Sequence, residues 1–272
     1  MDDAQRKEML RETFDTVSEG YDTESLRFFS ASAKHMAGLL KLRGDEQVLD
    51  VATGTGYAAL AISQFLSEGY VTAVDFSPGM LDRARSNAAS ENIRNVEFLE
   101  RDMQALGSLP DQFDIAVCAF GIFFVEDMDA QLLHIASTVK PGGRIMISNF
   151  QENYFQPLMG LFFKRLEARG IQMPPQTWKR ISNEPGCRRL FEQAGLIEVR
   201  VEMKNQGYYL DSAEQWWDVV WNAGLRRMVA QLRPEDRKQF KREHLQEIEA
   251  LRTDKGIWLD IGVLYTVGTK PF

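Results

Sequence analysis

The stretch that decides the fold is a glycine-rich turn between a short apolar run and an amphipathic segment. It reads Val48-Leu49-Asp50-Val51-Ala52-Thr53-Gly54-Thr55-Gly56-Tyr57. The apolar run is typical of a buried strand, and the periodic segment that follows it is typical of a helix. Glycine lets the backbone approach a ligand closely, and the N-terminus of a helix offers N–H groups to an anion. The turn therefore predicts a ligand site at the carboxyl end of a strand.

An acidic residue in the next predicted strand adds to this interpretation. Residues 70–75 form an apolar run that ends at Asp75, 19 positions after Gly56. A carboxylate at this place can accept hydrogen bonds from both hydroxyls of a ribose. Either feature alone is weak evidence, but the turn and the acid together predict a nucleoside ligand.

The position of Asp50 indicates which nucleoside this is. Residues 54–59 fit the G-x-G-x-x-A pattern of dinucleotide sites, but Asp50 stands four residues before Gly54. A fixed carboxylate repels a pyrophosphate and attracts an ammonium or a sulfonium. We therefore favour S-adenosyl-L-methionine as the cofactor and keep an NAD-dependent oxidoreductase as the alternative.

Strand-like and helix-like segments alternate through most of the chain. The expected strands cover residues 48–51, 70–75, 96–99, 113–119, 144–150, 197–203 and 257–267. Helical patterns separate most of these runs, and such alternation is typical of parallel βαβ units. We predict a Rossmann-like, doubly wound α/β fold with a mostly parallel seven-stranded sheet.

The segments outside the sheet are expected to cover it. We predict a single domain over residues 1–272, in which residues 1–43 form an N-terminal helical cap and residues 44–150 form the cofactor-binding core. Residues 151–185 and 207–256 are expected to serve as substrate or lid segments. The second of these is a helical insertion before the last strand, inferred from its apolar periodicity.

Composition narrows the class of protein further. The 272 residues are 44% hydrophobic and 26% charged, which is ordinary for a soluble globular protein. A net charge of −7 argues against a dedicated nucleic-acid binder. Two cysteines cannot form a disulfide framework and suggest a reducing compartment. The first residues lack the apolar core of a signal peptide, so we expect a cytoplasmic protein with at most peripheral membrane contact.

Five motifs in order give the sequence a family resemblance. They are Leu49-Asp50-Val51-Ala52-Thr53-Gly54-Thr55-Gly56, Val74-Asp75-Phe76-Ser77-Pro78-Gly79-Met80-Leu81, Arg101-Asp102-Met103, Phe113-Asp114-Ile115-Ala116-Val117 with Ala119-Phe120-Gly121, and Lys140-Pro141-Gly142-Gly143-Arg144. The sequence resembles the class I S-adenosylmethionine-dependent methyltransferases, most closely the ubiquinone/menaquinone biosynthesis group (type 11). The resemblance is strong over residues 44–150. Members of that group are shorter at the C-terminus, so residues 207–256 depart from the pattern.

The resemblance implies a role for individual residues. Near the methionine portion of the cofactor it places Asp50, Ala52, Thr53, Gly54 and Gly56. It assigns the ribose to Asp75 and the adenine to Phe76, Asp102 and Met103, and it adds Met80 to the cofactor-binding set. Beside the methionine ammonium and the transferring methyl group it places Ala119 and Phe120, and it makes Tyr21 a lid residue over the cofactor.

Methyl transfer from a sulfonium is an in-line displacement that depends mainly on positioning. A general base is needed only where the nucleophile carries a proton. The one candidate base is His35, in the N-terminal cap, because His134 and His244 fit packing positions better. The histidines and cysteines form no metal-spaced cluster, so we expect no metal.

Aromatic residues are frequent outside the expected sheet, which suits a small aromatic or apolar acceptor. Carbon, oxygen, nitrogen and sulfur acceptors remain open, as does the oligomeric state, and a non-catalytic methyltransferase-like module is a further alternative. Adjacent Trp216 and Trp217 are not expected to face the core together, so one is predicted to line a pocket or interface. Residues 226–242 carry seven Lys and Arg, which fit either a solvated helix face or a membrane surface.

Overall fold

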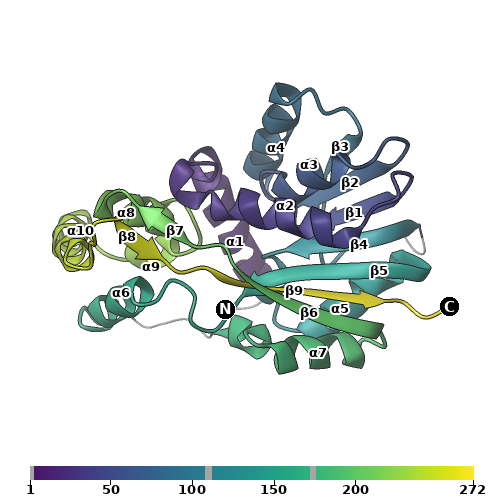
Figure 1. The fold of residues 1–272 in the computed structure, drawn as a ribbon. Helices are drawn as coiled ribbons and strands as arrows, with labels where there is room; N and C mark the ends of the chain where they lie inside the picture. The colour runs from purple at the N-terminus through teal and green to yellow at the C-terminus, as the bar shows by residue number, and fades with distance from the viewer. Residues whose placement is uncertain (1–2, 108–111, 172–175) are drawn as a thin grey trace. The chain divides into compact units, whose positions relative to one another are not determined.

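A seven-stranded sheet with the order β3-β2-β1-β4-β5-β9-β6 organises the computed structural model, which describes residues 3–107, 112–171 and 176–272 (Figure 1). Its strands are β1 (Gln47–Val51), β2 (Tyr70–Asp75), β3 (Val96–Glu100), β4 (Phe113–Ala119), β5 (Val139–Phe150), β6 (Ile197–Asn205) and β9 (Gly262–Thr269). Strands β1 to β5 pair in parallel, and β9 runs antiparallel to β5. The predicted mostly parallel α/β sheet is confirmed.

The chain divides into two compact units. The sheet unit comprises residues 29–152, 177–204 and 263–272, and the insertion unit comprises residues 1–28, 153–176 and 205–262. The insertion unit draws on the segments from which the sequence predicted a cap and a lid. A single domain with these roles stays a prediction, and residues 172–175 of the predicted lid lie outside the described residues.

Helices cover both faces of the sheet. On one face lie α2 (Phe28–Leu40), α3 (Tyr57–Ser63) and α4 (Pro78–Ser90), and on the other lie α5 (Met128–Ser137) and α7 (Glu184–Gln193) (Figure 1). Alternate strand residues face the two layers. Leu49 and Val51 join the core under α5 and α7, whereas Asp50 between them points to α3. Burial on both faces explains why these strands are almost continuously apolar.

The insertion unit differs from its prediction in two elements. The expected strand 257–267 is two strands, because β8 (Ile257–Leu259) pairs with β7 (Tyr208–Leu210) in a separate two-stranded sheet. The break falls at Asp260, whose carboxylate accepts a hydrogen bond of 2.6 Å from Asn205. The predicted helical insertion, residues 207–256, is likewise divided.

That stretch contains three helices: α8 (Ala213–Trp221), α9 (Arg226–Val229) and α10 (Pro234–Glu249). With α6 (Leu158–Glu167) and, at the N-terminus of the chain, α1 (Asp3–Val17), they belong to the insertion unit. Among the helices of the described ranges, none has the length and apolar character needed to cross a membrane.

Both adjacent tryptophans of α8 are buried, so the expectation that they do not face the core together is wrong. The indole of Trp216 packs edge-on against the rings of Phe155 and Phe162. The indole of Trp217 stacks on Trp221 and packs against Phe240 of α10. The helix is covered on more than one side within its own unit, which a single helical periodicity does not reveal.

His244 of α10 lies at the centre of this unit and is fully buried. The indole N–H of Trp216 donates to its Nε2 over 2.8 Å, so the ring is neutral with its proton on Nδ1, 3.6 Å from the Glu247 carboxylate. Burial lowers the pKa of His244 to about 4, although Glu247 acts in the opposite direction. His244 therefore belongs to the fold, as the sequence pattern indicated.

The depressed pKa of His244 predicts that the chain loses stability in mild acid. In the unfolded chain the pKa of this histidine is near 6.5. At a pH above that value the ring is neutral in both the folded and the unfolded chain, whereas at a lower pH the unfolded chain binds the proton first. Between pH 7 and pH 5 we expect this group to remove about 2 kcal/mol from the free energy of unfolding. Urea unfolding at both pH values measures the change, and the His244→Gln variant should show a smaller change. An equal change in both proteins would contradict the assignment.

Candidate active site

Backbone hydrogen bonds close the turn between β1 and α3 and attach it to β2. Thr53 donates its N–H to the carbonyl of Val74 over 2.9 Å, and Gly56 donates to the carbonyl of Thr53 over 3.0 Å. Gly54 donates its N–H to the Asp75 carboxylate over 2.8 Å. The turn therefore lies at the carboxyl ends of two neighbouring parallel strands, where open α/β sheets bind ligands.

The two glycines of the turn serve different purposes. Gly54 has φ +56°, and a Cβ added there would meet no atom within 4 Å, so the space beside its backbone is open. Gly56 has φ +90°, and a Cβ there would lie 3.2 Å from the Cβ of Ala84 and 3.4 Å from the ring of Phe98. Gly56 therefore allows α3 to pack closely on α4, while Gly54 leaves room for a ligand.

Asp50 is a fully buried carboxylate beside the turn. Its Oδ2 accepts the hydroxyl of Thr53 over 2.6 Å and the N–H of Ala59, in the first turn of α3, over 3.0 Å. Its Oδ1 has no hydrogen-bond partner. Burial raises the pKa of Asp50 to about 7, and the charge of Asp75 adds to the effect. A buried oxygen without a partner is costly, so the site favours an incoming donor or cation.

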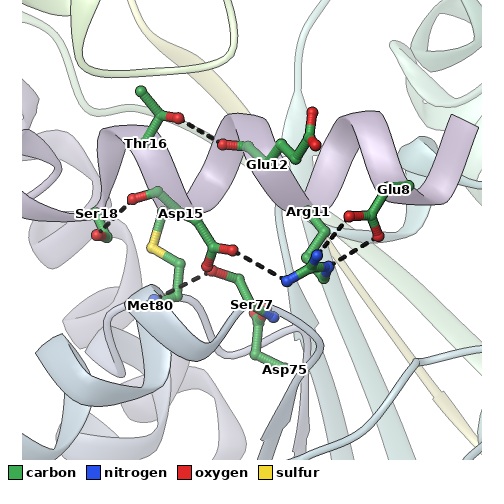
Figure 2. Close-up of polar contacts among 9 residues, drawn as sticks. All are labelled: Glu8, Arg11, Glu12, Asp15, Thr16, Ser18, Asp75, Ser77 and Met80. Atoms are coloured by element: carbon green, nitrogen blue, oxygen red, sulfur yellow. Dashed lines mark hydrogen bonds and ion pairs between the residues drawn. The ribbon is translucent and has the colours of Figure 1, made fainter.

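Asp75 holds two turns together. Its Oδ2 accepts from Gly54, and its Oδ1 accepts the N–H of Ser77 over 3.0 Å. Ser77 in turn caps α4, since its Oγ accepts the N–H of Met80 over 3.1 Å (Figure 2). A carboxylate at the end of this strand can accept hydrogen bonds from the hydroxyls of a ribose. Of the other residues predicted here, Met80 is buried in the first turn of α4 and Phe76 is partly buried directly after β2.

The loop after β3 carries Asp102 and Met103 and is held by α5. Gln131 donates its amide to the carbonyl of Met103 over 2.7 Å, and His134 accepts the N–H of Leu106 over 3.2 Å. Asp102 accepts the N–H of Gln104, two residues on. The sequence interpretation missed Gln131 and read His134 as packing or surface. Their spacing of three, which puts both on one helix face, is the signal that could have paired them.

Backbone strain marks the ends of β1 and β4. Ala52 and Phe120 adopt φ +57° and +53°, values that cost about 1–3 kcal/mol for residues other than glycine and gather at functional sites. The N–H of Phe120 donates to the carbonyl of Ser148 over 2.9 Å, which fixes the chain there. A Cβ at Gly121 would lie 2.9 Å from the Cβ of Ala52, so the two strained segments touch.

An aromatic cluster surrounds Phe120 at this end of the sheet. The ring of Phe120 lies 4.6 Å from that of Phe150 and 5.3 Å from that of Phe29, centroid to centroid. Phe123, in the short helical turn Ile122–Phe124 that follows β4, lies 6.4 Å from Phe150. Ala119 ends β4 next to this cluster. The carboxyl ends of β4 and β5 are therefore lined by apolar surface.

His35 lies apart from the residues at the ends of β1, β2 and β4. On α2 it packs edge-on against Tyr265 of β9, and its Nε2 bonds to the Glu202 carboxylate of β6 over 2.6 Å. Lys204, also on β6, donates to its Nδ1 over 3.2 Å. Both ring nitrogens are thus engaged at the β6 edge of the sheet. Tyr21 follows directly after a short helical turn in the insertion unit.

A glycine turn on β1, an acid at the end of β2 and a seven-stranded sheet with its last strand antiparallel form the class I methyltransferase architecture. Residues 48–143 match a family model described as a methyltransferase domain. Residues 48–143 are therefore a methyltransferase domain, and the chain is similar to S-adenosylmethionine-dependent methyltransferases.

Known proteins with related sequences support the class. An aklanonic acid methyltransferase of a Streptomyces species is 25% identical over 182 residues, covering 66% of this chain and 83% of the relative. A demethylmenaquinone methyltransferase of Staphylococcus aureus is 28% identical over 218 residues, covering 74% of this chain and 90% of the relative. The crystal structure of the YcgJ protein of Bacillus subtilis shares the fold, with a TM-score of 0.59 at 21% identity over 88% of this chain and 99% of that one.

The two glycines should respond differently to a methyl group. Gly54→Ala adds backbone strain of about 1–2 kcal/mol, whereas Gly56→Ala adds strain and an overpacking cost of about 1–3 kcal/mol more. Urea unfolding measures both losses. Gly38→Ala is the matched control, because Gly38 lies inside α2 with no atom within 4 Å of an added Cβ and should gain about 0.5–1 kcal/mol. Equal losses at Gly54 and Gly56 would contradict the close packing of α3 on α4.

Proposed function

We propose that this methyltransferase acts on a small acceptor with an aromatic or apolar body and acts in the cytoplasm. The observation that carries the cofactor assignment is the unpartnered Oδ1 of Asp50, fully buried beside the glycine turn. An anionic pyrophosphate gains nothing from that atom, whereas a cationic amino-acid nucleoside does. This disfavours the alternative of an NAD-dependent oxidoreductase.

The chain's residues fit an amino-acid nucleoside. Asp50 would attract the positive methionine portion, and the open space beside Gly54 would admit it, bordered by Ala52, Thr53 and Gly56. Asp75, at the carboxyl end of β2, would accept hydrogen bonds from the ribose hydroxyls. The adenine would lie against Phe76 and Met103, with Asp102 accepting from its amino group and Met80 packing beside the pocket. When bound, S-adenosylmethionine supplies a methyl group activated by its positive sulfur.

The work of this chain is to orient the acceptor and to exclude water. In-line positioning alone can supply about 7–11 kcal/mol. The aromatic cluster around Phe120, with Ala119 beside it, supports an acceptor that has an apolar surface. Two relatives are named as methyltransferases of aklanonic acid and of demethylmenaquinone. Both names agree with an acceptor that has an aromatic or apolar body.

We retain His35 as the base where the acceptor must lose a proton, and Tyr21 as a lid residue. Because Glu202 and Lys204 engage both nitrogens of His35, that role requires one of these bonds to open. An acceptor that is already ionised needs no base. The transfer then depends on orientation within the apolar cluster.

Calorimetric titration with S-adenosylmethionine, S-adenosylhomocysteine and NAD tests the cofactor site. We expect micromolar binding of the first two and none of NAD, and at least tenfold weaker binding by Asp75→Ala, which loses the acceptor of the ribose bonds. The variant also frees two N–H groups, so its free energy of unfolding should fall by about 1–3 kcal/mol while it stays folded. Asp82→Ala removes the same charge from an exposed site on α4 and should bind normally. Unchanged affinity in Asp75→Ala would overturn the ribose assignment.

The raised pKa of Asp50 predicts that cofactor affinity depends on pH. Below pH 7 the free protein holds a proton on Asp50, and a bound cation expels it. The affinity for S-adenosylmethionine should therefore fall roughly tenfold per pH unit below pH 7, with proton release visible as a buffer-dependent enthalpy. Asp50→Asn should bind weakly and lack this pH dependence. A wild-type affinity that is flat between pH 7 and pH 5.5 would exclude Asp50 from the cofactor site.

Transfer of labelled methyl from S-adenosylmethionine to a panel of acceptors tests the acceptor class. Phenols, hydroxylated quinols and aromatic carbon acids should be methylated in preference to polar aliphatic amines of similar size. Replacing Phe150 with Ala should raise the KM for aromatic acceptors more than the Kd for the cofactor. Cofactor binding without turnover across the panel would favour the non-catalytic module instead.

A further inference from the structure

We propose that the insertion unit contains a binding site for an oxyanion, a carboxylate or a phosphate group, formed by Arg226 and Arg237 around the indole of Trp221. The proposal is independent of the cofactor site, which lies in the sheet unit. The proposal gives a function to residues 226–242, whose lysines and arginines fit either a solvated helix face or a membrane surface on the sequence alone.

Basic residues in this stretch fall into two groups. The exposed Arg233 pairs with Asp236 over 2.7 Å, Lys238 pairs with Glu235 over 3.1 Å, and Lys241 pairs with Glu214 over 2.7 Å. In contrast, Arg226 and Arg237 are only partly exposed, yet no carboxylate among the described residues forms an ion pair with either of them. The exposed Arg242 likewise forms no ion pair with a described residue, so Arg226 and Arg237 differ from it by combining a missing counter-charge with partial burial.

The geometry gathers these cations around one indole. The guanidinium carbon of Arg226, from α9, lies 4.2 Å from the centre of the Trp221 ring, and that of Arg237, from α10, lies 5.1 Å from it. Trp221 itself is held by stacking on Trp217 at 6.3 Å. Cation–π contacts fix the planes of both guanidinium groups. Three separate helices, α8, α9 and α10, thus contribute to a defined cluster.

This arrangement is unfavourable without an anion. Loss of solvent lowers the pKa of Arg226, and the charge of Arg237 lowers it further. Partly buried charges are normally paired. Guanidinium groups bind carboxylates and phosphates through paired hydrogen bonds, so an oxyanion would relieve both the repulsion and the desolvation.

Calorimetry of the full-length protein with inorganic phosphate and with benzoate, at constant ionic strength, tests the site. We expect saturable binding to the wild type. The double variant Arg226→Gln/Arg237→Gln should weaken it at least tenfold. The matched control Lys238→Gln/Arg242→Gln removes the same charge from exposed positions of α10 and should change it less than twofold. Binding of S-adenosylhomocysteine by each variant verifies that the sheet unit is intact, and circular dichroism verifies the helices.

Two sources can present such an oxyanion, and sedimentation with vesicles distinguishes them. Binding to phosphatidylglycerol vesicles that is lost in the Arg226/Arg237 variant and absent for phosphatidylcholine identifies a lipid headgroup. Binding of free phosphate or benzoate without vesicle binding identifies a small-molecule ligand. No saturable binding in either assay, or equal weakening by the control variant, would overturn the proposal.

Discussion

The carboxylate of Asp75 connects the parts of the molecule on which the ligand site depends. It accepts one N–H from the glycine turn at Gly54 and one from Ser77 at the start of α4. The backbone carbonyl of the same residue accepts the N–H of Arg101, after β3. One residue thus joins the carboxyl ends of β1, β2 and β3. Each hydrogen bond is worth about 1 kcal/mol, but their loss would release three loops together.

Around this connection the fold keeps features that oppose its own stability. Asp50 is buried near a second carboxylate, with one oxygen left without a partner. Ala52 and Phe120 hold strained backbone conformations at neighbouring strand ends. Arg165 of the insertion unit, by contrast, pairs with both Glu243 and Glu247. The cost at the strand ends is consistent with a site that is organised before its ligand arrives, so that little reorganisation accompanies binding.

The sequence sufficed where local chemistry dictates structure. The turn at Gly54 and the cap at Ser77 are read from neighbours in the chain, and β2 ends at Asp75 as expected. Helix–strand alternation predicted the sheet for the same reason. The sequence-based predictions failed where contacts between distant segments of the chain determine the structure. Trp217 is buried because α10 packs beside it, and no periodicity within α8 reports that partner.

The same limit applies to functional residues. Gln131 supports the loop at Met103 from a helix 28 positions away, so its role depends on tertiary packing. The basic stretch is a sharper case. In sequence its lysines and arginines look alike, but the structure separates Arg233, which is exposed and paired, from Arg226, which is partly buried and has no ion pair. Charge alone therefore identifies no site. A charged side chain indicates a site where the fold buries it at least in part and places no counter-ion beside it. Asp50 meets this condition as an anion and Arg226 meets it as a cation.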